Sequence, residues 1–232
     1  METLIDFRIS NTEAMRGESR IPIDGDLTGD GAPNLLAAAH SGGTHCCWEY
    51  HIYSLGNDFR KINVLVTQDA EVRFVNLDHD PAFEAETYDF DFAYWYTSFG
   101  ASPVPRIVFK FKDGKYRIAP DLMRRPSPPE AELRREAMNL RTDGDWNRSP
   151  NQPYDPKLWK IMLDLIYTGH YARADRFLNE AWPSSRNDKR RFRHEFFECQ
   201  LRRSHNWTAI AAMNHMPTDA PLTSCPSCPE YG

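Results

Sequence analysis

The stretch Arg106-Ile-Val-Phe-Lys-Phe-Lys-Asp-Gly-Lys-Tyr-Arg-Ile118 decides the fold of the first half of this chain. Two short segments rich in β-branched and aromatic residues flank Asp113-Gly114. An Asp-Gly pair readily adopts the positive φ angles of a two-residue hairpin turn. The stretch therefore predicts two antiparallel strands joined by a tight turn.

Upstream of this hairpin, four further segments have the composition of strands. Residues 4–9 and 88–92 alternate apolar with polar side chains, as half-buried strands do. Residues 48–53 and 62–66 are rich in β-branched and aromatic residues. We therefore predict a module of β-hairpins over residues 1–122.

The character of the sequence changes after residue 122. Prolines and a charged segment in residues 123–155 predict a linker with a short helix. Asp155 is a suitable N-cap with Pro156 in the first turn, and residues 156–215 have the apolar periodicity of about three helices. Residues 216–232 form an expected extended tail. The predicted fold class is α+β, with a β-hairpin-rich module followed by a helical segment.

The composition excludes some classes of protein. The chain has 232 residues and a formal net charge of -5, which argues against a general nucleic-acid binder. No apolar run is long enough to span a bilayer, so we expect no transmembrane segment. The opening METLIDFRIS lacks the features of a signal peptide. A cytoplasmic chain and an exported chain without its leader both fit this opening.

One acidic stretch, residues 26–34 (the first loop), has the spacing of a calcium site. Calcium takes six to eight oxygen ligands, and alternate residues of a tight loop can direct oxygens to one point. Numbered from Asp26, side-chain oxygens fall at positions 1, 3, 5 and 9, and a carbonyl is available at position 7. The predicted ligands are Asp26, Thr28, Asp30, Ala32 and Asn34. An EF-hand is excluded because position 12 is Ala37 and not glutamate.

The segment Asp26-Leu27-Thr28-Gly29-Asp30-Gly31-Ala-Pro-Asn34-Leu35 resembles the calcium loop of FG-GAP or VCBS-type repeats. That loop runs roughly Asp-Leu-Asn-Gly-Asp-Gly-x-x-Asp-Leu between two strands, and Thr28 and Asn34 depart from it. The whole chain is also similar to bacterial proteins that have one or two such loops and a helical C-terminal part. The resemblance implies bound Ca²⁺ and an exported or surface-exposed protein. Such repeats commonly build propellers, for which two loops are too few.

A second acidic stretch, residues 76–84 (the second loop), repeats this spacing. Its candidate ligands are Asn76, Asp78, Asp80, Ala82 and Glu84. Pro81 stands where the family has glycine, and proline cannot adopt a left-handed turn. We therefore expect the first loop to be the stronger site. For both loops the alternative is a hairpin turn that binds nothing.

A different metal chemistry is possible at the cysteines. The residues His45, Cys46, Cys47, Cys225 and Cys228 are of the types that bind zinc or copper. No second Cys-x-x-Cys completes a zinc site, and disulfide-bonded or structural cysteines are the alternative. The chain has five cysteines, so at least one is unpaired or bonded to another molecule.

These patterns support three functional hypotheses. The first is a non-enzymatic, extracytoplasmic calcium-binding module with a structural or protein-interaction role, whose partner would be a protein. The second is a soft-metal or redox protein that uses the histidine and cysteine cluster. The third is a hydrolase with an acidic site. No phosphate loop, dinucleotide fingerprint or serine-hydrolase motif occurs, and we assign no catalytic residue.

Overall fold

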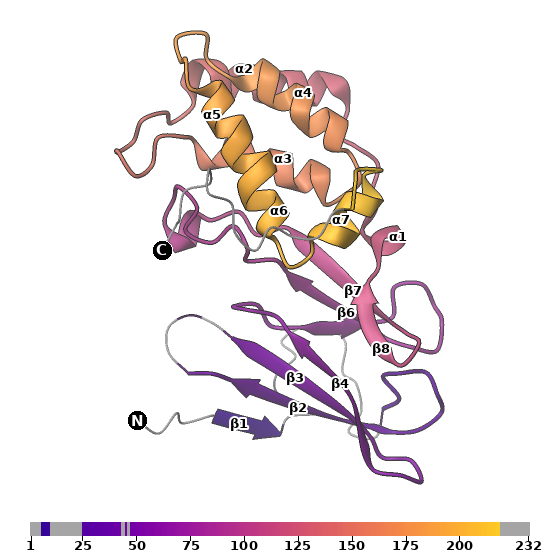
Figure 1. Ribbon diagram of the computed structural model, residues 1–232. Coiled ribbons are helices and arrows are strands. Elements are labelled where there is room, and N and C mark those ends of the chain that lie inside the picture. The colour runs from indigo at the N-terminus through magenta and orange to yellow at the C-terminus, as the bar shows by residue number, and fades with distance from the viewer. Residues whose placement is uncertain (1–5, 10–24, 43–44, 46, 219–232) are drawn as a thin grey trace. The chain divides into compact units, whose positions relative to one another are not determined.

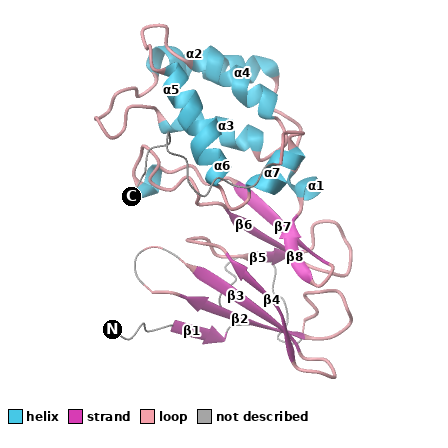
Figure 2. Ribbon diagram, viewed as in Figure 1, coloured by secondary structure: helices cyan, strands magenta, loops and turns pink. Residues whose placement is uncertain are grey.

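The computed structural model describes residues 6–9, 25–42, 45 and 47–218, and it confirms the α+β fold (Figure 1). Within these residues the strands precede residue 119, and the α-helices follow from Pro120 (Figure 2). The chain forms two compact units. The first ends at Phe90 and resumes for Arg106–Leu122, whereas the second comprises Asp91–Pro105 and the chain from Met123. Residues 91–105, which the sequence analysis placed in the β module, therefore belong to the helical unit.

The first unit contains two antiparallel sheets of four strands each, and both are ordered as in the sequence. We call the strands of each sheet, with the acidic loop after its first strand, a repeat. The first repeat consists of β1 (Asp6–Ile9), β2 (Asn34–His40), β3 (Trp48–Ser54) and β4 (Arg60–Val66). The second consists of β5 (Arg73–Val75), β6 (Glu84–Tyr88), β7 (Arg106–Lys112) and β8 (Lys115–Ile118). The predicted turn between β7 and β8 is confirmed, with Asp113 and Gly114 at φ 51° and 79°.

The two repeats place their acidic loops at equivalent points. Each loop lies between the first and second strands of its sheet, and the last loop residue, Asn34 or Glu84, begins the second strand. These two residues are 50 positions apart in the sequence. The duplicated spacing in the sequence therefore corresponds to a duplicated arrangement of strands.

Both sheets contribute to one apolar core. The first repeat supplies the buried side chains Leu36, Ala38, Tyr50, Ile52 and Leu65. The second supplies Phe74, Ala85 and Tyr116. Leu27 of the first loop belongs to the same core, so the acidic stretch is anchored by its apolar residue. Because apolar burial is the main stabilising term in folding, neither sheet is expected to be stable without the other.

The predicted strand over residues 88–92 is wrong beyond its first residue. Strand β6 ends at Tyr88, and the chain then turns, with Tyr94 and Tyr96 at φ 61° and 52°. Phe92 and Trp95 are fully buried, and both pack against Phe196 of the helical unit. The alternating apolar residues therefore continue into a turn whose aromatic rings pack in the helical core. Periodicity over a few residues could not predict this, because it does not identify the packing partner.

The helical unit begins with elements that the sequence predicted. Its helices include α2 (Glu130–Asp143), α3 (Pro156–Ile166) and α4 (Tyr171–Ala181), and α4 packs against both α2 and α3. A short helix, α1 (Pro120–Met123), precedes them. Asp155 caps the N-terminus of α3 by accepting a 2.8 Å hydrogen bond from the Lys157 N–H. The predicted N-cap is confirmed. Gly169, in the turn that follows α3, has the left-handed φ of 88° that is common after a helix C-terminus.

The third predicted helix is present but irregular. It comprises α5 (Lys189–Arg193), a π-helical stretch (His194–Gln200) and α6 (Leu201–Arg203). A further helix, α7 (Trp207–Met213), was not predicted. None of the helices in the described part of the chain is long and apolar enough to cross a membrane.

Candidate metal centre in the second acidic loop

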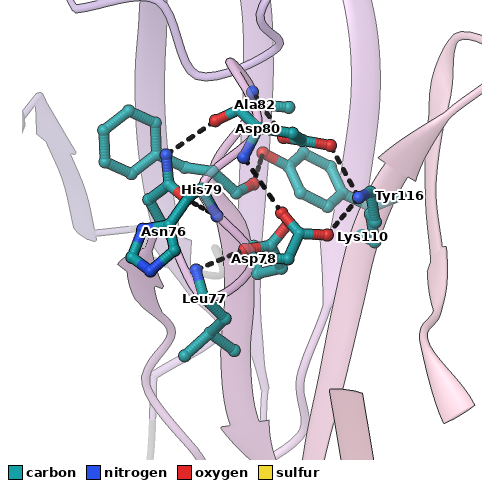
Figure 3. Close-up of polar contacts among 10 residues, drawn as sticks. Asn76, Leu77, Asp78, His79, Asp80, Ala82, Lys110 and Tyr116 are labelled. Carbon is teal, nitrogen blue, oxygen red and sulfur yellow. Dashed lines mark hydrogen bonds and ion pairs between the residues drawn. The ribbon is translucent and has the colours of Figure 1, made fainter. Parts of the chain in front are cut away.

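Three carboxylates of the second loop lie close together. One oxygen each from Asp78, Asp80 and Glu84 lies within 4.8 Å of the other two. Figure 3 shows Asp78 and Asp80 of this group. The loop between β5 and β6 supplies the two aspartates, and Glu84 begins β6. This is the group of ligand types that a hard divalent cation prefers.

The loop is shaped by hydrogen bonds from its own backbone. The His79 N–H donates to Asn76 Oδ1 at 2.6 Å, and the Leu77 N–H donates to Glu84 Oε2 at 2.7 Å. The Ala82 N–H donates to Asp80 Oδ1 at 2.8 Å. These bonds fix three of the predicted ligand side chains before any ion is present.

Pro81, which the sequence analysis held against this loop, does not keep the carboxylates apart. The left-handed residue of the second loop is His79, at φ 64°, which is position 4 of the loop. Pro81 is at position 6 and does not need a positive φ. The loop therefore closes without the glycine that the family pattern has there, and the carboxylates converge.

Glu84 is the buried member of the cluster. Its side chain is 0% exposed, and its Oε1 atom has no hydrogen-bond partner in the described residues. Burial raises the pKa of Glu84, and the neighbouring Asp78 and Asp80 raise it further, against the lowering effect of the Leu77 N–H. A buried acceptor without a partner is costly. Glu84, one of the three converging carboxylates, thus has a buried oxygen without a partner in the described residues.

A lysine that the sequence analysis did not identify completes the cluster. Lys110 on β7 places its Nζ against Asp78 Oδ2 and at 2.6 Å from Asp80 Oδ2 (Figure 3). Its ammonium holds the pKa of Asp78 below the usual value, and the two aspartates raise the pKa of Lys110. Nothing in the sequence of the loop pointed to Lys110, because β7 lies more than 20 residues downstream and is brought near by sheet register.

The first loop has the same backbone pattern. The Gly29 N–H donates to Asp26 Oδ1 at 2.7 Å, and the Ala32 N–H donates to Asp30 Oδ1 at 3.0 Å. The Leu27 N–H donates to Asn34 Oδ1 at 2.7 Å. All three bonds join the same loop positions as in the second loop. The two loops are therefore versions of one structural motif.

The first loop nevertheless uses its oxygens differently. Asn34 Oδ1 also accepts from the Thr28 N–H at 3.1 Å and from Thr28 Oγ1 at 3.3 Å. A carbonyl oxygen has two lone pairs, so three donors leave Asn34 Oδ1 saturated. Asp26 Oδ2 in turn accepts from the Gly31 N–H at 2.7 Å. In this arrangement Asp26, Asp30 and Asn34 accept hydrogen bonds from the loop's own backbone.

The two loops lie side by side. The Phe83 N–H donates to the Leu27 carbonyl at 3.0 Å, and the buried Tyr116 hydroxyl lies 2.9 Å from the Phe83 carbonyl, to which it donates. A Cβ added at Gly29 would lie 2.7 Å from the Ala82 nitrogen. The candidate metal centre is thus built at the junction of the repeats.

The proposed soft-metal cluster is only partly within the described residues. Cys47 is disulfide-bonded, which removes the thiolate that a zinc or copper ion would need. His45 Nδ1 lies 3.6 Å from Asp69 Oδ1. The other members of the predicted cluster, Cys46, Cys225 and Cys228, lie outside the described residues. For Cys47 the alternatives were metal binding and a disulfide, and the structure contains the disulfide.

Comparisons with known proteins give no match: no protein-family model matches the chain, and neither a curated protein nor a solved structure is significantly similar to it. The function is therefore argued from the geometry of the two loops.

Proposed function

We propose that the first unit is a calcium-binding module whose ion lies in the second loop. The observation that carries the proposal is the convergence of Asp78, Asp80 and Glu84, with the Glu84 side chain fully buried and its Oε1 atom lacking a partner in the described residues. An isolated carboxylate oxygen in such a place is stabilised by a cation more than by water.

The ligand chemistry favours calcium over other divalent ions. The cluster offers only carboxylate oxygens, which exclude a soft-metal preference. Calcium accepts carboxylates in one- or two-oxygen contacts and tolerates irregular geometry, whereas magnesium demands a near-ideal octahedron. Three carboxylates with added waters meet the six to eight oxygens that calcium takes.

The proposed role of the ion is structural. The second loop contacts the first loop through backbone hydrogen bonds, and both sheets share one core. An ion held by three carboxylates would fix the second loop and, through it, the junction of the repeats. This is a non-enzymatic role, and the surface so fixed would serve a protein partner.

We further propose that the protein works outside the cytoplasm. Cys47 and Cys199 are both disulfide-bonded, and disulfides form and persist in oxidising compartments. Calcium sites of extracellular modules also need only millimolar affinity, which suits a site with few ligands.

The test is a thermal scan of chelator-treated protein with and without calcium. We expect calcium to raise the melting temperature, since a ligand at a hundredfold excess over its Kd stabilises the fold by about 2.7 kcal/mol. Asp80→Asn should remove most of this rise, because it deletes one of the converging charges while keeping an oxygen for the Ala82 N–H.

The matched control is Asp30→Asn, at the same position of the first loop, which should keep the calcium-dependent rise. The quantity compared is the difference with and without calcium, because Asp80→Asn also changes the contact with Lys110. A protein with no calcium response, or an equal loss in both variants, would refute the proposal.

A further inference from the structure

We infer that Lys110 is a resident cation of the second loop, which holds the loop closed without metal and competes with calcium for Asp78 and Asp80. The inference rests on the proposed calcium site and adds how that site is regulated. It does not depend on the identity of any partner.

The geometry supports competition and not a separate ion pair. The Lys110 Nζ contacts one oxygen of each aspartate, and both aspartates belong to the three-carboxylate group. An ion that used the same oxygens would meet the ammonium at contact distance, and two positive charges so close repel strongly. Calcium bound to these oxygens must therefore displace Lys110. The lysine side chain is 30% exposed, so its flexible stem has access to solvent into which it can move.

The first repeat shows that the lysine is specific to the second loop. In the first repeat, Asn34 pairs with Ser54 of β3. In the second repeat, Ala85 pairs with Phe109, and the same antiparallel register places Lys110 opposite Glu84. Ser54 and Lys110 are thus equivalent positions. Ser54 is buried, carries no charge and accepts a hydrogen bond from the Gly56 N–H at 3.3 Å.

The number of carboxylates in each loop matches the charge of the residue opposite, Ser54 or Lys110. The first loop carries two carboxylates and faces an uncharged serine, whereas the second carries three carboxylates and faces Lys110. One lysine therefore cancels the one additional carboxylate. The formal charge around each loop is the same, although the second loop holds its carboxylates together. Lys110 allows three carboxylates to converge in the metal-free protein, where they would otherwise repel.

The experiment is a calcium titration by calorimetry of full-length protein in an Asp30→Asn background, which silences the first loop. The background protein is compared with the same protein carrying Lys110→Gln. Lys112→Gln is the matched control, because Lys112 is an exposed residue on the same strand. We expect Lys110→Gln to bind calcium about tenfold or more tightly, by analogy with the one or more pKa units by which an adjacent charge changes the proton affinity of a carboxylate. The control should leave the affinity unchanged.

The outcomes separate this inference from the proposed function. Equal affinities of the background and Lys110→Gln proteins would overturn the inference and leave the calcium site standing. Binding by Lys110→Gln alone would support the inference and show that the lysine excludes calcium from the natural loop. Absence of binding in both would overturn both, because removal of the competitor should expose the site.

Lys110→Gln brings three carboxylates together without a counter-ion and can unfold without metal. In that case the midpoint of calcium-dependent refolding is measured by circular dichroism. Refolding at a calcium concentration below that which half-saturates the background protein supports competition. A variant that calcium does not refold overturns it.

Discussion

At the scale of single residues, a comparison of Gly29 with Gly31 distinguishes the effect of backbone strain from the effect of contact between the loops. Both have a positive φ, 71° and 82°, which disfavours any residue with a Cβ. A Cβ at Gly29 would lie 2.7 Å from the Ala82 nitrogen and 2.8 Å from the Pro81 carbonyl carbon, whereas a Cβ at Gly31 would meet nothing within 4 Å. The two glycines thus share a left-handed φ and differ in their neighbours.

We therefore predict unequal effects of the same substitution. Gly31→Ala should lower the free energy of unfolding by about 1–2 kcal/mol, the cost of a left-handed residue with a Cβ. Gly29→Ala should cost that amount and roughly 1–3 kcal/mol more, because it overpacks against backbone that cannot move aside alone. Denaturant unfolding of both variants measures the difference. Equal losses would show that the loops do not touch at Gly29.

At the scale of elements, the segment Asp91–Pro105 is a structural part of the helical unit. Trp95 is 1% exposed, and its ring contacts Trp159 of α3, Phe192 of α5 and Phe196 of the π-helical stretch. Three separate helical elements thus pack around one side chain that the sequence analysis placed in the β module. The segment closes the core of the helices.

Trp95→Ala should consequently destabilise the helical unit. We expect a loss of about 3–5 kcal/mol in the free energy of unfolding, as for other large aromatic side chains removed from cores. The loss should be visible in the helical signal of circular dichroism. Met138→Ala, at a residue that is 65% exposed on α2, is the control and should change stability by less than about 0.5 kcal/mol. A loss as small as that of the control would remove Trp95 from the core.

At the scale of the whole molecule, the disulfides set the number of free thiols. The chain has five cysteines, and two of them, Cys47 and Cys199, are disulfide-bonded. At most three thiols therefore remain. We predict that no more than three react with a thiol reagent in denaturant without reductant, when the protein is made in an oxidising compartment. Five reactive thiols would contradict both the disulfides and the proposed extracytoplasmic location.

The sequence by itself determined the features that depend on neighbouring residues. Asp113-Gly114 indicated the hairpin of β7 and β8, because an Asp-Gly pair at the turn favours positive φ. Asp155 and Pro156 indicated the start of α3 through capping. The acidic spacing indicated both loops, since hydrogen bonds within nine residues shape them. These signals act over short distances in the chain, so they are visible in the sequence.

Only the tertiary structure decided which groups meet. Sheet register brings Lys110 to Asp78 and Asp80, and Trp95 packs into the core of the helical unit. The closure of the second loop was misjudged for the same reason: the prediction considered only the φ of Pro81, whereas the left-handed residue is His79 and the loop also contacts the other repeat. Long-range contacts are fixed by the combined packing of many side chains, and no short stretch of sequence contains that information.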